Sequence, residues 1–238
     1  MQDLTICRCP VTRQRLVQID PGHLQTADGS RSYGVVHGIP DFRLFDPPYI
    51  SREEEFAICG KLVEKSRDHT YAEVLQYLEL DLAGDRPDAA KRKSLQHRMA
   101  LRERAPSRLR ELLDRAGRAD VPKGGRILDL GCGSGEATVA LSGMGAGEVV
   151  GIDISMVELV LAKKLFEECG IEATLVAGCA EALPFEESVF DFVFSPDVIE
   201  HVTDQGSYLK EARRVLRAGG QVLLNSPNRY SVVCPEPH

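Results

Sequence analysis

The sequence of 238 residues predicts an α/β fold class, in which a doubly wound and mostly parallel sheet follows a short-stranded N-terminal segment and a helical cap. Three observations predict it. From Arg126 onward, strand-like apolar runs alternate with segments of helical periodicity, as in parallel sheets joined by helices. A glycine-rich loop follows the first of these runs. The 43% hydrophobic residues are enough to bury a sizeable core.

The first 46 residues predict a small, turn-rich unit. Gly, Pro and Asp are frequent there, and short strands are expected at residues 16–19 and 33–36. The run Asp46-Pro47-Pro48 closes this unit, because proline lacks a backbone donor and restricts its neighbours.

Residues 47–120 predict a helical cap. Ser51 and Thr70 are each followed three residues later by Glu, which is the capping-box pattern of a helix start. Pro87 and Pro106 are expected to break up the basic stretch that follows, and Gly117 to end the last helix.

The remaining part, residues 121–238, predicts the α/β unit. A third capping-box pattern at Ser155 opens one of its helices, and Gly170 ends that helix. The expected strands lie at residues 127–130, 149–152, 174–176, 190–194 and 221–224, and the expected helices at 136–144, 155–169 and 204–217. The sequence therefore predicts three parts, at 1–46, 47–120 and 121–238.

Composition and charge exclude some classes of protein. No apolar run approaches the ~20 residues of a membrane span, so an integral membrane protein is excluded. The first residues lack a secretory signal, and seven cysteines without a repeated spacing favour a reduced, cytoplasmic compartment. The net charge of −7 is the sum of −5 over residues 1–90, +8 over 91–126 and −10 over 127–238. It disfavours nucleic-acid binding without excluding it.

The glycine-rich loop is the most informative segment. It contains Gly131, Gly133 and Gly135 between a predicted strand and a predicted helix. Glycines there permit a tight turn and a close approach of a ligand to the backbone. A dinucleotide fingerprint would need Gly or Ala at the position of Glu136, where an acidic side chain would repel a pyrophosphate. Asp153, at the end of the next strand, is placed to accept hydrogen bonds from both ribose hydroxyls of an adenosine.

Five segments in order resemble motifs of class I S-adenosylmethionine-dependent methyltransferases, in the branch of ubiquinone/menaquinone-type and natural-product enzymes. They are Ile127–Gly135, Gly151–Ser155, Ala180–Phe185, Phe190–Ser195 and Val215–Gly220. The resemblance covers about residues 122–230. It implies a Rossmann-like fold and S-adenosylmethionine as the cofactor.

The resemblance also implies a cofactor-binding set. Asp153 would hold the ribose, Ile154 would pack on the adenine, and Ala180 would offer it a backbone N–H. Cys179 stands where the family often has an Asp that accepts from the adenine amino group, and a thiol is a weaker acceptor. The full set is Asp129, Gly131, Cys132, Gly133, Gly135, Asp153, Ile154, Cys179, Ala180 and Ser195.

The segment after the fourth strand of this unit predicts the floor of an active site. His201 is the candidate general base and Asp197 a candidate for orienting the acceptor, although a helix start favours acidic residues in any case. Asn225 and Asn228 are further candidates to line the site, with turn formation as the alternative.

We therefore expect a methyltransferase that acts on oxygen, carbon or nitrogen of a small molecule. An RNA methyltransferase and a non-catalytic scaffold or partner subunit are the alternatives.

The two ends of the chain depart from the family pattern. Cys9-Pro10-Val11-Thr12 and Gly38–Phe42 resemble a small zinc ribbon, but Thr12 stands in place of the second knuckle cysteine. Cys7, Cys9, His23 and His37 could form a site on paper, but Cys-x-Cys is not the usual knuckle spacing, so no metal is predicted. The usual C-terminal strand pair of the family is missing from the sequence, so we expect a truncated fragment, or an oligomer or partner chain that covers the edge of the fifth strand.

Overall fold

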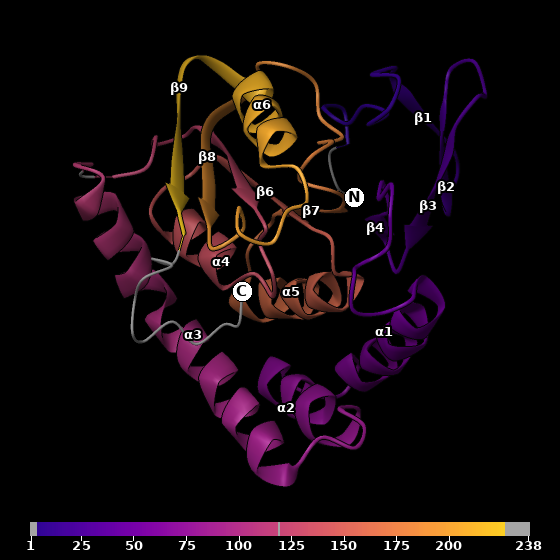
Figure 1. Cartoon of the computed structure of the whole chain (residues 1–238), viewed down its shortest axis with the longest axis vertical. Helices are drawn as coiled ribbons and strands as arrows, with labels where there is room; N and C mark the ends of the chain where they lie inside the picture. The colour runs from indigo at the N-terminus through magenta and orange to yellow at the C-terminus, as the bar shows by residue number, and fades with distance from the viewer. Residues whose placement is uncertain (1–3, 119, 227–238) are drawn as a thin grey trace.

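The computed structural model describes residues 4–118 and 120–226, and it contains two sheets (Figure 1). The N-terminal sheet is antiparallel, with the order β1-β2-β3-β4. Its strands are β1 (Leu16–Asp20), β2 (His23–Thr26), β3 (Ser32–Val36) and β4 (Ile39–Pro40). The two strands expected from the sequence are confirmed, and two shorter ones complete the sheet.

The second sheet has five parallel strands in the order β7-β6-β5-β8-β9. They are β5 (Arg126–Leu130), β6 (Glu148–Asp153), β7 (Thr174–Ala177), β8 (Phe190–Pro196) and β9 (Leu216–Asn225). The chain winds outward from β5 through β6 to β7, and then returns to β8 on the other side of β5. The point between β5 and β8 is therefore the switch point at which ligands bind in such sheets.

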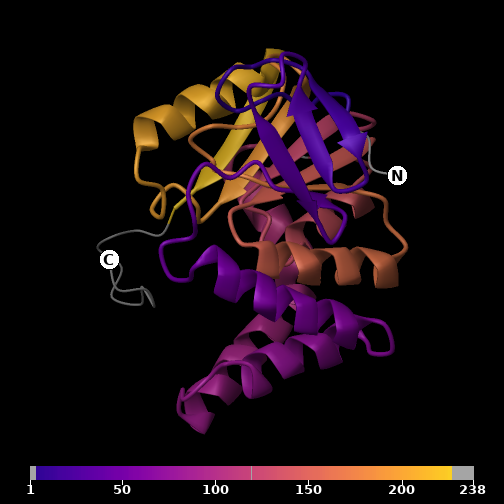
Figure 2. The same ribbon diagram turned by 90° about the vertical axis from the view of Figure 1, so that its right-hand side faces the viewer.

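Helices cover one face of this sheet, and a helix together with the N-terminal sheet covers the other. On the first face lie α4 (Glu136–Gly143) and α5 (Met156–Cys169). On the second face, α6 (Gln205–Val215) packs beside the small sheet (Figure 2). The connection from β7 to β8 contains no helix, and buried side chains of the small sheet, such as Leu24 and Tyr33, share one core with β5, β6 and β8. The Rossmann-like, doubly wound α/β prediction is confirmed.

The helical cap lies against the first face. It contains α1 (Arg52–Ser66), α2 (Tyr71–Gln76), a π-helical turn η1 (Tyr77–Asp81) and α3 (Asp88–Arg115). The capping boxes at Ser51 and Thr70 are present with both hydrogen bonds. At Ser155 the side chain accepts from the Glu158 amide.

The prediction that Pro106 interrupts the basic stretch is wrong. The helix α3 runs for 28 residues with Pro106 inside it. Proline in a helix interior costs about 3 kcal/mol. Leu109, Leu112 and Leu113, in the turns that follow, are buried against β5, β8 and α4, and this burial offsets the cost.

The chain after β4 joins the edge of the parallel sheet. Asp41 bridges Ala177 of β7 in parallel, and the Phe42 amide donates to the Ala177 carbonyl at 2.8 Å. The edge strand β7 is thereby partly covered by the N-terminal part of the chain. At the opposite edge lies β9; Asn228 and the rest of the expected C-terminal continuation fall outside the described residues. Over residues 4–118 and 120–226, no helix is long and apolar enough to cross a membrane.

Candidate functional site

A cavity of about 480 Å³ lies at the carboxyl ends of the parallel strands. This volume is typical of sites that enclose a small ligand. The loops after β5, β6, β7 and β8 all contribute to its walls, and the segment between β4 and α1 closes it. We call it the strand-end cavity. It is lined by Phe45, Asp46, Pro48, Tyr49, Leu130, Gly131, Ile152, Asp153, Ile154, Gly178, Ala180, Glu181, Asp197, Val198, His201, Val202 and Thr203.

The glycine loop after β5 follows a path that other residues would obstruct. Gly131 has φ +82°, and a Cβ there would lie 2.3 Å from Cγ2 of Val198. Gly135 has φ +89°, and a Cβ there would lie 2.6 Å from Cε1 of Phe166. The first glycine keeps the loop against the wall of the cavity, and the second brings α4 close to α5.

Asp153 is fixed at the end of β6 by the loop it faces. One carboxylate oxygen accepts from the Gly133 amide and the other from the Ser155 amide, each at 2.9 Å. Burial raises the pKa of the Asp153 carboxyl, against the effect of the backbone amides. A carboxylate oxygen has a second lone pair, so both oxygens are able to accept further bonds from ligand hydroxyls.

Asp129 lies beneath the loop rather than in the cavity wall. It is 1% exposed, and its carboxylate accepts from the Thr138 hydroxyl at 2.6 Å. Burial raises the pKa of Asp129 to about 7, and the charges of Asp153 and Glu136 act in the same direction. This hydrogen bond joins β5 to α4.

Asp197 and His201, the two candidates for the chemistry, both line the cavity. Asp197 has φ +55°, an unusual conformation for a residue other than glycine. Asn225 holds it there on two sides: the Asp197 amide donates to the Asn225 carbonyl at 2.7 Å, and the Asn225 side chain donates to Oδ1 of Asp197 at 2.8 Å. Arg108 of α3 donates to the other carboxylate oxygen. Strained backbone that is held in this way is frequent at functional sites.

The Asp, Glu, Lys and Arg side chains that line the cavity within residues 4–118 and 120–226 are all acidic, and they number four. They are Asp46, Asp153, Glu181 and Asp197. Two of them, Asp46 and Asp197, pair with Arg52 and Arg108, which lie outside the wall. The remaining wall is largely apolar, with Phe45, Ile154 and Val198 among its members. Such a site suits a ligand that has hydroxyl groups, an apolar ring and a positive charge, and it repels a pyrophosphate.

The wall formed by Phe45, Asp46, Pro48 and Tyr49 is absent from the sequence prediction. Its position depends on Arg43, whose side chain is fully buried and pairs with Asp41 at 2.8 Å and with Glu55 at 2.5 Å. Arg43 also donates to the Ile154 carbonyl at 2.9 Å. These contacts join the linker, α1 and the end of β6. The proline pair at 47–48 was the only sequence signal, and it indicated a boundary rather than a site.

Four of the ten predicted cofactor residues line the cavity: Gly131, Asp153, Ile154 and Ala180. The other six lie around it. Cys179 is 1% exposed and its sulfur accepts from the Leu44 amide at 3.4 Å, so it contacts the linker. Ser195 is buried, donates to the Leu130 carbonyl at 2.7 Å and accepts from Tyr208 at 2.8 Å.

Cys132, Gly133 and Gly135 belong to the loop itself. The Cys132 amide donates to the Ile152 carbonyl at 3.0 Å, and its side chain is buried. Glu200, a neighbour of His201, has both carboxylate oxygens buried without a hydrogen-bond partner among the described residues.

The N-terminal cysteines lie in a protein core. Cys7 and Cys9 are buried, and the Cys9 sulfur lies 3.0 Å from the Tyr33 hydroxyl and accepts from the Thr12 amide at 3.3 Å. His23 lies 3.0 Å from the Asp20 carboxylate. Within residues 4–118 and 120–226, no group of three or more His, Cys, Asp or Glu side chains could hold a metal ion.

The basic helix α3 pairs with acidic residues of the rest of the fold. Arg98 donates to Glu79 at 3.0 Å and to Glu158 at 2.5 Å, and Arg108 pairs with Asp197. Part of the positive charge of residues 91–126 is thereby neutralised within the molecule. These contacts reduce the attraction of this segment for a polyanion.

Comparisons with known proteins found similarity to methyltransferases in the α/β part of the chain. Residues 128–224, which run from β5 to β9, match a family model described as a methyltransferase domain. A ubiquinone biosynthesis O-methyltransferase of Azorhizobium caulinodans is 36% identical over 107 residues, or 45% of this chain and 42% of that protein. A demethylmenaquinone methyltransferase of Bacillus licheniformis is 38% identical over 106 residues, or 44% of this chain and 45% of that protein.

Among solved structures, a phosphoethanolamine N-methyltransferase of Haemonchus contortus in complex with S-adenosyl-L-methionine is 30% identical, with a TM-score of 0.44. The match covers 51% of this chain and 27% of that one. The chain spans less than half the length of the curated relatives it matches. The predicted resemblance to class I methyltransferases is confirmed for the segment from β5 to β9.

Proposed function

We propose that this chain, whose residues 128–224 form a methyltransferase domain, binds S-adenosylmethionine in the strand-end cavity and transfers its methyl group to a small molecule. The observation that carries the proposal is the cavity wall, to which the described part of the chain contributes four carboxylates and no lysine or arginine. S-Adenosylmethionine is a cation with a ribose and an adenine ring whose flat faces are apolar. A nicotinamide dinucleotide carries a pyrophosphate, which this wall would repel.

The residues present fit the cofactor. Asp153, already held by two backbone amides, would accept from the ribose hydroxyls. The side chain of Ile154 and the backbone of Ala180 would enclose the adenine, with Tyr49 from the linker on the same wall. Gly131, which lines the cavity, would lie beside the methionine end.

When bound, the cofactor supplies a methyl group on a positive sulfur, and this group forms a bond to the acceptor atom while the carbon–sulfur electron pair stays on sulfur. The chain's own contribution is to align the acceptor and exclude water. If the acceptor is a hydroxyl, Asp197 or His201 would take its proton, since both line the cavity.

The names of the relatives and the state of the cysteines support two further parts of the proposal, the kind of acceptor and the location. The relatives are named for ubiquinone biosynthesis and for demethylmenaquinone, which supports a small-molecule acceptor rather than a nucleic acid. The six cysteines of the described residues form no disulfide bond with one another, which supports a cytoplasmic location. The first 46 residues would then be a ribbon-like unit without metal that acts as a structural cover of the sheet.

Calorimetric titration with S-adenosylhomocysteine tests the proposal. The wild-type chain is expected to bind it, and to show no heat of binding with NAD. The substitution Asp153→Ala removes an acceptor of two charge-assisted hydrogen bonds, each about 1.5–3 kcal/mol, so affinity should fall at least about a hundredfold. Asp114→Ala, at an exposed position of α3, is the matched control and should bind as the wild type does. No binding by the wild-type chain would overturn the proposal.

A further inference from the structure

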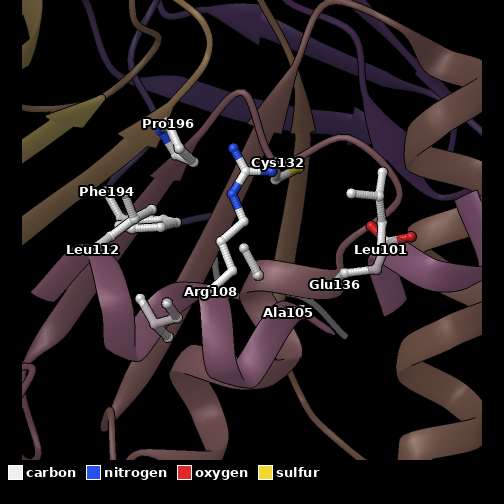
Figure 3. Close-up of a pocket in the computed structure, with 10 residues that line it drawn as sticks. Leu101, Ala105, Arg108, Leu112, Cys132, Glu136, Phe194 and Pro196 are labelled. Carbon is white, nitrogen blue, oxygen red and sulfur yellow. The ribbon is translucent and has the colours of Figure 1, made fainter. Parts of the chain in front are cut away.

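A second, smaller cavity lies between α3 and the parallel sheet, on the other side of the glycine loop. Its volume is about 120 Å³. Apolar side chains form most of its wall, among them Leu101, Ala105, Leu112 and Phe194. Figure 3 shows Arg108 extending into this space, with its guanidinium between Pro196 and Cys132. We call it the α3 cavity.

At two places, consecutive residues of the chain line the two different cavities. Gly131 lines the strand-end cavity and Cys132 the α3 cavity. Asp197 lines the strand-end cavity, whereas Pro196, directly before it, lines the α3 cavity. The ion pair between Arg108 and Asp197 therefore lies where the cavities meet. A ligand in the α3 cavity would therefore lie next to Asp197, which lines the cavity proposed for the cofactor.

The chemistry of the α3 cavity defines a class of ligand. A dry apolar cavity of about 150 Å³ holds a benzene ring in another protein, so a wall of this kind suits a single ring or a short alkyl group. Among the residues that the structure describes, Arg108 is the only lysine or arginine in the wall. The other charged residue there, Glu136, accepts from the Tyr71 hydroxyl at 2.8 Å and the Ser134 hydroxyl at 3.0 Å. The side chain of Arg108 is 44% exposed. It is therefore placed to meet an anion that enters from outside.

Arg108 is able to bind such an anion without leaving Asp197 alone. A guanidinium has five N–H donors in a planar fork. Asp197 also accepts from the Asn225 side chain at 2.8 Å, which holds its carboxylate in place when Arg108 turns toward a second acceptor.

We propose that the α3 cavity is the methyl-acceptor subsite, which takes a small acceptor with an apolar ring and an anionic substituent, and that Arg108 positions that substituent. This proposal rests on the proposed function. Arg108 is a positioning residue and takes no part in the bond that is made or broken.

Titrations with benzoate and benzamide, two rings of equal size with and without a charge, test the proposal. Both are measured in the presence of saturating S-adenosylhomocysteine. The wild-type chain is expected to bind benzoate at least tenfold more tightly than benzamide. Arg108→Gln should abolish this preference, while Arg110→Gln should keep it, because Arg110 is an exposed arginine of the same helix outside the cavity wall.

A second variant tests the apolar part of the cavity. Ala105→Leu would fill the space, so binding of benzoate should be lost while binding of S-adenosylhomocysteine stays within about twofold of the wild type. Equal binding of benzoate and benzamide by the wild type, or an unchanged preference in Arg108→Gln, would overturn the acceptor subsite. A tenfold loss of S-adenosylhomocysteine affinity in Arg108→Gln would also overturn it, because Arg108 would then serve the cofactor. Failure of the wild type to bind S-adenosylhomocysteine would instead refute the proposed function.

Discussion

Replacing Arg43 with methionine should destabilise the protein far more than the loss of an ordinary surface charge. The Arg43 side chain is fully buried, and it donates two hydrogen bonds to Asp41, one to Glu55 and one to the Ile154 carbonyl. Burial favours the neutral guanidine, yet the hydrogen bonds to Asp41 and Glu55 raise the pKa of Arg43 above its usual value. Arg43→Met would remove the cation that pairs with the buried Glu55 carboxylate, and would leave the Asp41 carboxylate its longer contact with Arg52 at 3.8 Å.

Breaking a buried pair by removing one partner costs about 3–5 kcal/mol. With a slope of about 2 kcal/mol per molar urea, the unfolding midpoint should fall by about 2 M. Urea unfolding followed by circular dichroism measures this shift. Arg52→Met is the matched control: Arg52 pairs with Asp46 at 2.7 Å and lies 3.8 Å from the Asp41 carboxylate, but its side chain is 37% exposed. Exposed pairs contribute about 1 kcal/mol or less, so its midpoint should move little.

If Arg43→Met changes the free energy of unfolding by less than about 1 kcal/mol, the buried ion pairs of Arg43 do not hold the linker in place. The linker would then be held over the cavity by other contacts. If the reasoning is right, Arg43→Met should also weaken binding of S-adenosylhomocysteine more than Arg52→Met does, because Arg43 connects the linker to the cavity wall at Ile154.

Three further outcomes are expected. Gly131→Ala should unfold at a clearly lower urea concentration than Gly133→Ala, because only the first Cβ collides with a neighbour, Val198, although both glycines have positive φ; equal midpoints would contradict this. Burial raises the pKa of Asp129 to about 7 in the folded protein, against an ordinary value of 3.8. Its contribution to the free energy of unfolding is therefore lost as the pH rises from about 4 to 7. In unfolding measurements over this pH range, Asp129→Asn should gain stability relative to the wild type. Tyr49→Ala should raise the dissociation constant of S-adenosylhomocysteine about five- to tenfold in calorimetry, since Tyr49 forms part of the linker wall; an unchanged constant would place the ligand away from that wall.

The parallel sheet could be predicted because its strands are buried on both faces. Strands such as β6 and β8 therefore appear as continuous apolar runs, and the glycine loop marks the first crossover. The strands β2 and β4 carried a weaker signal. They have four and two residues, and their pairing depends on tertiary contacts.

Three features of the structure could not be predicted from local sequence. The linker wall depends on Arg43, whose contact with Ile154 joins residues 111 positions apart. Pro106 was expected to interrupt the basic stretch, but packing of the neighbouring leucines outweighs the local preference of proline. The separation of Cys179 from the cavity has a similar origin, because its partner, Leu44, lies in the same linker.

The proposed function requires an adenosine ligand in the strand-end cavity with its ribose on Asp153. A crystal structure of the protein with S-adenosylhomocysteine bound would show whether it lies there. We expect ribose hydroxyls within hydrogen-bond distance of the Asp153 carboxylate, the adenine between Ile154 and Ala180, and the amino-acid end beside Gly131. A nucleoside bound elsewhere, or one whose ribose does not reach Asp153, would contradict the proposed function.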